Sequence, residues 1–216
     1  LEYIGQAQLR TDIENLKAPL LGLPHEDVFM PAIAPSYIAA TLTNEYYRTE
    51  AEYERAIADA LHEEYQAIVD AGFILQIDDP RLVTYYMMNP GKSVADCRKW
   101  AGERVEAINY SIRDIPPEKI RFHTCYSIDV GPRIHDMELR DIVDIILRIN
   151  AGAYSFEAAN PRHEHEYHVF EQVRLPEGKI LIPGVISHTT NLVEHPELIA
   201  ERITRFAALV GRENVI

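Results

Sequence analysis

Short apolar runs alternate with longer amphipathic segments along the whole chain. The apolar runs are mostly continuous rather than alternating with polar residues, as expected for parallel strands that are covered on both faces. Five of them predict strands, at Val28–Ala34, Phe73–Asp78, Ile120–Tyr126, Tyr154–Glu157 and Ile180–Ile186. The residues from Asn214 onward have the pattern of a sixth strand that is just beginning.

The amphipathic segments predict helices between these strands. The clearest helix begins at Thr49, whose hydroxyl is expected to form a capping box with Glu52, and it ends at Gly72. Its apolar residues recur at helical spacing on one face: Tyr53, Ile57, Leu61, Tyr65, Ile68 and Val69. Three further helices are expected, from Ser93 to about Ile112, over Leu139–Asn150 and over Pro196–Val210.

The connections from strand to helix differ from those that return from helix to strand. The connections after Asp78, Cys125 and Glu157 are long and rich in charged, His, Pro and Asn residues, whereas the return connections are brief. In a (β/α)8 barrel the chemistry lies on the loops that follow the strands. The pattern therefore predicts an α/β fold, with residues 1–216 forming one catalytic TIM-barrel domain that is incomplete at both ends. An open α/β sheet also fits the alternation.

Composition and charge narrow the classes of partner. The 216 residues are 47% hydrophobic and 25% charged, which is typical of a globular domain. A formal charge of -13 disfavours binding to nucleic acid or to an anionic membrane, because like charges would meet. No apolar run reaches the roughly 18 residues of a membrane span, and no signal sequence is evident, so a soluble cytoplasmic protein that binds small molecules is expected.

A combination of His, Cys and Glu residues at two neighbouring strand ends predicts a metal site. His123 and Cys125 lie two residues apart on one strand and therefore point to the same face, and Glu157 ends the next strand. Zinc accepts this mixture of nitrogen, sulfur and oxygen ligands, and three protein ligands leave one position open for catalysis. The alternative interpretation is a core cysteine beside a hydrogen-bonded histidine.

Other polar residues near strand ends are candidates for binding and catalysis. Asp78 and Asp79 end an apolar strand and are predicted either to hold a substrate ammonium group or to cap the following turn. His188 is a candidate general acid or a turn residue. The polar segment at residues 160–166 either closes over a site or forms a solvated loop. Cys97 lies on the apolar face of its helix and is interpreted as a core residue.

Four strand ends resemble, in order and spacing, the catalytic barrel of the cobalamin-independent methionine synthase family. They are Ile77-Asp78-Asp79-Pro80, His123-Thr124-Cys125-Tyr126, Phe156-Glu157 and Gly184-Val185. The resemblance implies a TIM barrel of the type shared with uroporphyrinogen decarboxylase. It also implies zinc (Zn²⁺) bound by His123, Cys125 and Glu157, with the family's fourth ligand, a cysteine, expected just beyond Ile216. The polar loop after Glu157 is similar to that of short, single-barrel members, which are grouped with epoxyalkane:coenzyme M transferase.

The same resemblance implies a reaction and its substrates. The expected activity is transfer of a methyl group from methyltetrahydrofolate to the thiol of homocysteine, which forms methionine. Asp78 matches the acid that contacts the substrate amino group, Asp79 replaces the family's glutamate, and His188 matches a histidine that protonates the leaving amine. The expected partners are thus a small thiol and a folate-type methyl donor.

Three other functions remain open at this stage. They are an alkyltransferase that joins an epoxide to another thiol, a metal-free decarboxylase, and a non-catalytic binding barrel. Association into a homo-oligomer is also left open, because unpaired edge strands invite pairing with another chain.

Overall fold

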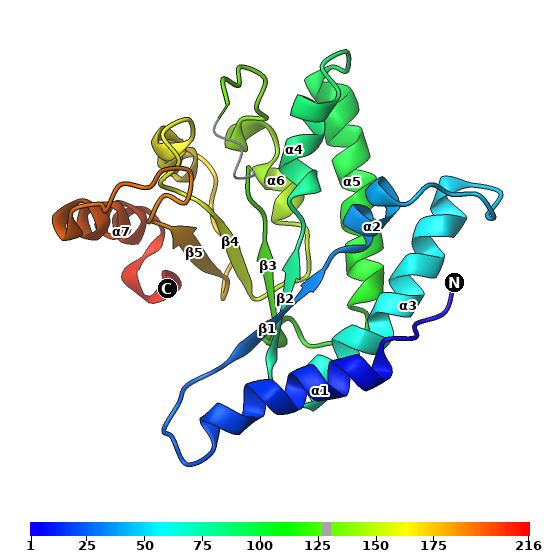
Figure 1. Cartoon of the computed structure of the whole chain (residues 1–216). Coiled ribbons are helices and arrows are strands. Elements are labelled where there is room, and N and C mark those ends of the chain that lie inside the picture. Colours follow the sequence, from blue (N-terminus) through cyan, green and yellow to red (C-terminus); the bar gives the residue numbers. More distant parts are fainter. Residues whose placement is uncertain (127–130) are drawn as a thin grey trace.

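The computed structural model describes residues 1–126 and 131–216. Within them, five parallel strands form one sheet in the order β1-β2-β3-β4-β5 (Figure 1). The strands are β1 (Phe29–Ile33), β2 (Ile74–Asp78), β3 (Ile120–His123), β4 (Ala153–Glu157) and β5 (Ile180–Gly184). Each strand pairs with the next one in sequence, as in a barrel to which every βα unit adds one strand. The predicted α/β fold with part of a TIM barrel is confirmed.

Helices connect the strands. They are α1 (Gln6–Lys17), α2 (Pro35–Thr41), α3 (Glu50–Asp70), α4 (Arg81–Met88), α5 (Val94–Ser111), α6 (Val143–Ile146) and α7 (Pro196–Val210). Short 3-10 helices are η1 (Ala18–Leu20), η2 (Pro117–Lys119), η3 (Leu139–Asp141), η4 (Glu164–Glu171) and η5 (Arg212–Asn214). In Figure 1, α2, α3, α4 and α5 lie together on the β1–β2 side, while α7 lies beside β5 at the other end. None of the helices in the described part of the chain is long and apolar enough to cross a membrane.

Local signals in the sequence place the three longest of these helices. The Thr49 hydroxyl accepts a hydrogen bond from Glu52 N (3.1 Å) at the start of α3. Ser93 and Asp96 form a full capping box at the start of α5, and α7 begins at Pro196 as predicted. The pattern does not predict α1, α2, α4 or η4.

The helix predicted over Leu139–Asn150 is wrong in its length. The segment forms only the short helices η3 and α6, which are separated by Ile142 (φ -138°). Its β-branched residues disfavour a helix. The Tyr154 hydroxyl donates to the backbone oxygen of Ile149 at 2.7 Å, which satisfies a carbonyl beyond the end of α6.

The two faces of the sheet differ in their surroundings. Side chains that face the helices, among them Leu75, Ile77 and Phe122, are fully buried. Side chains on the other face form successive layers, because the strands pair in parallel register: Asp78 lies beside His123, and His123 beside Ser155. Asp78, His123 and Ser155 are partly exposed within the part of the chain that the structure describes. The continuous apolar runs had instead predicted a sheet that is covered on both faces. The open inner face is where polar side chains gather.

The predicted sixth strand is present only as an isolated bridge. Val215 pairs in parallel with Leu181 of β5, and Ile216 N donates to Leu181 O at 3.0 Å. Asn214 itself belongs to η5.

Candidate active site

Inward-facing polar side chains gather at the carboxyl ends of β2, β3 and β4. Asp78 and His123 share one layer of the sheet. Glu157 lies beside Gly184 and two residues beyond Ser155, the β4 partner of His123, so it belongs to the next layer, about 7 Å further along the strands. Cys125 follows His123 by two residues, which corresponds to the layer of Glu157. Sequence reasoning therefore placed these residues at the correct end of neighbouring strands.

His123 is oriented by a carboxylate. Its Nδ1 atom lies 2.9 Å from Asp78 Oδ1, which also accepts a hydrogen bond from the Gln76 side chain at 2.8 Å. With Nδ1 as the donor to the carboxylate, Nε2 keeps its lone pair. Metal-binding histidines commonly have this arrangement, because the carboxylate fixes the tautomer and the orientation of the ring.

Glu157 is a buried carboxylate with two different oxygens. Oε2 accepts hydrogen bonds from the backbone N–H of Tyr126 (3.2 Å) and from Asn160 Nδ2 (3.1 Å). Oε1 is buried and accepts no well-oriented hydrogen bond from the residues that the structure describes, although His188 Nε2 lies 2.9 Å from it. The structure thus brings His188 to the end of β4, beside one of the predicted metal ligands.

Asp79 faces the helices rather than the inner face of the sheet. Its side chain is fully buried, and it accepts hydrogen bonds from the backbone N–H groups of Arg81 (3.0 Å) and Leu82 (3.1 Å) and from the Ser36 hydroxyl. Burial raises the pKa of Asp79 to about 6, although these hydrogen bonds favour the ionised form. In this structure Asp79 caps the turn that leads into α4, which is the second of the two roles that the sequence left open.

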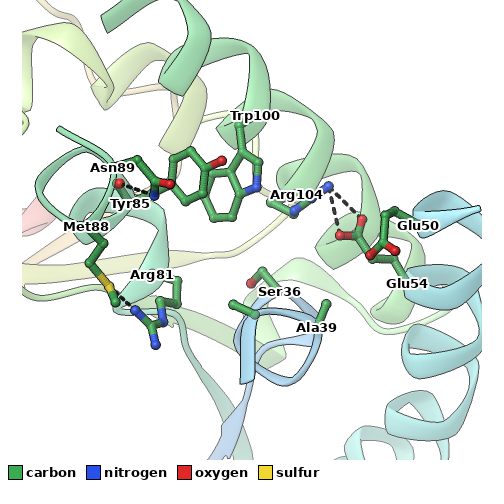
Figure 2. Close-up of a pocket in the computed structure, with 11 residues that line it drawn as sticks. Ser36, Ala39, Glu50, Glu54, Arg81, Tyr85, Met88, Asn89, Trp100 and Arg104 are labelled. Atoms are coloured by element: carbon green, nitrogen blue, oxygen red, sulfur yellow. Dashed lines mark hydrogen bonds and ion pairs between the residues drawn. The ribbon is translucent and has the colours of Figure 1, made fainter. Parts of the chain in front are cut away.

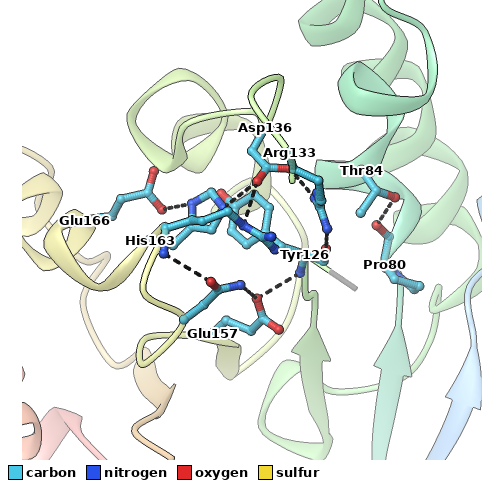
Figure 3. Close-up of polar contacts among 10 residues, drawn as sticks. Pro80, Thr84, Tyr126, Arg133, Asp136, Glu157, His163 and Glu166 are labelled. Carbon is cyan, nitrogen blue, oxygen red and sulfur yellow. Dashed lines mark hydrogen bonds and ion pairs between the residues drawn. The ribbon is translucent and has the colours of Figure 1, made fainter. Parts of the chain in front are cut away.

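The polar segment at residues 160–166 buries three of its side chains, those of Asn160, His163 and Glu166, and sequence reasoning missed their connections. His163 lies between two carboxylates, with Nδ1 3.0 Å from Glu166 Oε2 and Nε2 3.3 Å from Asp136 Oδ2 (Figure 3). Its ring stacks on that of Tyr126 with centroids 3.5 Å apart. Arg133 pairs with Asp136 and donates to the Tyr126 carbonyl. We call the set of Asp136, His163 and Glu166 the histidine clamp.

Charge within the histidine clamp is mutually stabilised. Burial lowers the pKa of His163, but the hydrogen bonds and charges of Asp136 and Glu166 outweigh this effect and raise it overall. Burial raises the pKa of Asp136, and His163 and Arg133 outweigh it, so the pKa of this carboxyl is lowered. The clamp therefore favours an imidazolium between two carboxylates, which fastens the loop after β3 to the loop after β4.

Comparison with known proteins agrees with this architecture. A protein-family model described as "Cobalamin-independent synthase, Catalytic domain" matches residues 35–216. The chain belongs to this family. Among solved structures, a B12-independent methionine synthase from a Shewanella species, in complex with selenomethionine, is similar with a TM-score of 0.71 and 17% sequence identity. The match covers 100% of this chain and 58% of the other, so this chain spans less than two thirds of that protein. A search of curated proteins found no significant match.

The cobalamin-independent synthase family implies a metal, and the donor types fit zinc. Imidazole, thiol and carboxylate are ligands that zinc accepts, and within residues 1–126 and 131–216 the buried Oε1 of Glu157 has no well-oriented hydrogen-bond donor. The three proposed ligand side chains do not converge on one point, however: among the described residues, no three His, Cys, Asp or Glu side chains are arranged to share one ion. In this structure His188 Nε2 lies 2.9 Å from the Oε1 atom of Glu157.

The helices on the β1–β2 side of the sheet surround a hollow. A cavity of about 340 Å³ opens between α2, α3, α4 and α5 (Figure 2). Its walls include the rings of Tyr85 and Trp100, which stack with centroids 3.8 Å apart, and the buried ion pair of Arg104 with Glu54 at 2.8 Å. Ser36 lines this cavity and donates to Asp79, which is how the cavity adjoins the end of β2.

Proposed function

We propose that this chain carries most of the site of a zinc-dependent S-methyltransferase, which moves a methyl group from methyltetrahydrofolate to the thiol of homocysteine. The observation that supports it is the position of His123, Cys125 and Glu157 at or just after the carboxyl ends of β3 and β4, in a member of the cobalamin-independent synthase family. The related Shewanella structure contains selenomethionine, an analogue of the methionine that this reaction forms.

The proposed zinc ligands are His123 through Nε2, Cys125 through its sulfur, and Glu157 through Oε1. Bound zinc would act as a Lewis acid that lowers the pKa of a substrate thiol, so that a thiolate is present near neutral pH. Ligation by Glu157 requires His188 to leave Oε1, from which its Nε2 is 2.9 Å away in this structure. The side chain of His188 is 43% exposed, which gives the ring room to turn.

The remaining roles belong to Asp78 and His188. Asp78 uses Oδ1 to accept from Gln76 and His123, which leaves Oδ2 for the ammonium group of an amino-acid substrate. Such a charge-assisted hydrogen bond would orient the substrate sulfur toward the methyl donor. Once released from Glu157, His188 would supply a proton to the departing N5 of the folate. Asp79 would support Asp78 by fixing the turn between β2 and α4.

Metal content tests this proposal directly. Zinc per chain is measured in the complete translated polypeptide, in Cys125→Ser and in the matched control Cys97→Ser, whose side chain is buried in the core on α5. About one zinc is expected in the unchanged protein and in the control, and much less in Cys125→Ser. The absence of zinc from the unchanged protein, or equal zinc in both variants, would contradict the proposed ligand set.

A kinetic measurement tests the proposed substrates. Asp78→Asn is expected to raise KM for homocysteine by about tenfold or more, since a hydrogen bond to a charged group contributes about 1.5–3 kcal/mol. Because Asp78 also orients the proposed ligand His123, KM is compared at saturating zinc, so that the change reports the contact with the substrate. Transfer from an epoxide to another thiol, with none from methyltetrahydrofolate, would favour the alkyltransferase alternative.

A further inference from the structure

The proposed ligand Glu157 has a buried amide partner that the proposed reaction does not use. Asn160 is 3% exposed and donates from Nδ2 to Glu157 Oε2 at 3.1 Å. It follows β4 by three residues and lies in the loop that leads to η4. Asn160 is therefore placed to act on the orientation of this carboxylate.

The amide of Asn160 is held in one orientation. Its Oδ1 accepts a hydrogen bond from the backbone N–H of Arg162 at 3.1 Å, and its backbone carbonyl accepts from His163 N and Glu164 N at 2.8 Å each. Because the oxygen end of the amide already faces an N–H donor, the NH₂ end must face Glu157. The side chain thus presents a donor to Oε2, with the turn as its support.

The histidine clamp holds this turn in place. Asp136 and Glu166 bind the two ring nitrogens of His163, and Glu166 Oε1 also accepts from Leu139 N at 2.7 Å. The His163 ring lies against Tyr126, whose backbone N–H is the second donor to Glu157 Oε2. Both donors to Oε2 therefore come from segments that the clamp fastens together.

We propose that Asn160 is a positioning residue that fixes Glu157 Oε2 and so presents Oε1 to the metal. This inference rests on the proposed function, because it takes Glu157 as a zinc ligand. Among the described residues, two N–H groups donate to Oε2, whereas only the exposed His188 ring lies near Oε1. Holding Oε2 in this way gives the carboxylate a preferred direction for ligation through Oε1. Groups that orient metal ligands in this way typically change metal affinity or activity by about 10–100-fold when they are substituted.

Two substitutions separate the donor function from the support of the turn. Asn160→Asp keeps the shape and the acceptor for Arg162 N–H but replaces the donor by an oxygen. Asn160→Ser keeps a hydroxyl acceptor for the turn but is too short to reach Glu157. His165→Asn is the matched control, because His165 lies in the same segment and is exposed.

Affinity for Zn²⁺ is measured by competition with a chromogenic chelator, on the complete polypeptide and without substrate. Both Asn160 variants are expected to bind zinc about 10–100-fold more weakly than the unchanged protein, and His165→Asn equally well. At saturating Co²⁺, the thiolate-to-cobalt absorption band should persist in all of them, because Cys125 is unchanged. Circular dichroism of the metal-free proteins reports whether the fold is retained.

The outcomes distinguish this inference from the proposed function. Equal zinc affinity in the unchanged protein and in folded Asn160 variants would overturn the positioning role while the zinc site stands. Loss of the fold in both Asn160 variants would also overturn it, because the role would then be structural. If the unchanged protein binds no zinc, the proposed function itself fails, and the inference fails with it.

Discussion

Asp79 carries a carboxyl group whose ionisation opposes folding. Its pKa is about 6 in the folded chain, against 3.8 for an ordinary aspartate. A raised pKa of this kind contributes stability that is fully present below about pH 4 and is lost as the pH rises through about 6. The shift corresponds to about 3 kcal/mol at neutral pH.

Asp79→Asn is therefore expected to remove this pH dependence. The amide keeps an acceptor for the N–H groups of Arg81 and Leu82, and it can donate to the Ser36 hydroxyl. Between pH 4 and pH 7, the free energy of unfolding should fall by about 3 kcal/mol more in the unchanged protein than in the variant. Denaturant unfolding at several pH values measures this difference, and parallel pH profiles would contradict the prediction.

The position of a single residue could be predicted where the local sequence determines which way its side chain points. His123 and Glu157 could be placed because strand periodicity and strand ends are visible in the sequence. Asn160 and His163 could not be placed in this way, because a polar segment is expected to be solvated until its tertiary partners are known. Asp136, which binds His163, is 27 residues away in sequence. The clustering of His, Glu and Asn in one short loop was the only local signal.

At the scale of elements, one buried ion pair joins α3 to α5. Arg104 Nη1 lies 2.8 Å from Glu54 Oε1, and the two side chains are 15% and 7% exposed. Burial raises the pKa of Glu54, and the nearby Arg104 lowers it only in part. Removing the cation would leave a buried carboxylate without a counterion.

Arg104→Leu is expected to lower the free energy of unfolding by about 3–5 kcal/mol. The double variant Arg104→Leu with Glu54→Leu should recover much of this loss, because no uncompensated charge remains. A double-mutant cycle by chemical denaturation measures both quantities. A single variant that is as stable as the unchanged protein would show that the pair does not stabilise the α3–α5 contact.

The connection from α6 to β4 depends on a close backbone approach. A Cβ atom added at Gly152 would lie 2.7 Å from Pro117 O and 3.1 Å from Glu118 Cα. Gly152→Ala is expected to reduce stability by about 1–3 kcal/mol, since backbone atoms must move. Gly91→Ala is the control, because its added Cβ meets no atom within 4 Å. Thermal unfolding compares the two, and equal melting temperatures would contradict the expectation.

Elements were predictable to the extent that they bury one continuous apolar run. All five strands begin and end within three residues of their predicted bounds. The segment after Leu139 was predicted as one long helix, because its apolar spacing also fits a helix. The result is two short pieces, since packing against β4 and the hydrogen bond from Tyr154 determine its path. Apolar periodicity does not contain this tertiary information.

At the scale of the whole molecule, the sheet has a protected centre and two edges. In the described residues, β2, β3 and β4 pair on both sides, whereas β1 pairs only with β2. In the 216-residue chain, backbone amides of β2, β3 and β4 are expected to exchange with deuterium most slowly, and those of β1 faster. Hydrogen-exchange mass spectrometry measures this order. Equal protection of β1 would indicate that another segment or a second copy covers that edge.

The stacking of Tyr85 on Trp100 has a spectroscopic consequence. Trp100 is the sequence's one tryptophan, and its ring contacts both Tyr85 of α4 and the guanidinium of Arg104, which lies 4.9 Å from the ring centroid. Indole emission therefore comes from a single point in the helical layer, and it is sensitive to the separation of α4 from α5. If emission changes at lower denaturant than the far-ultraviolet dichroism does, the helical layer loosens before the secondary structure is lost.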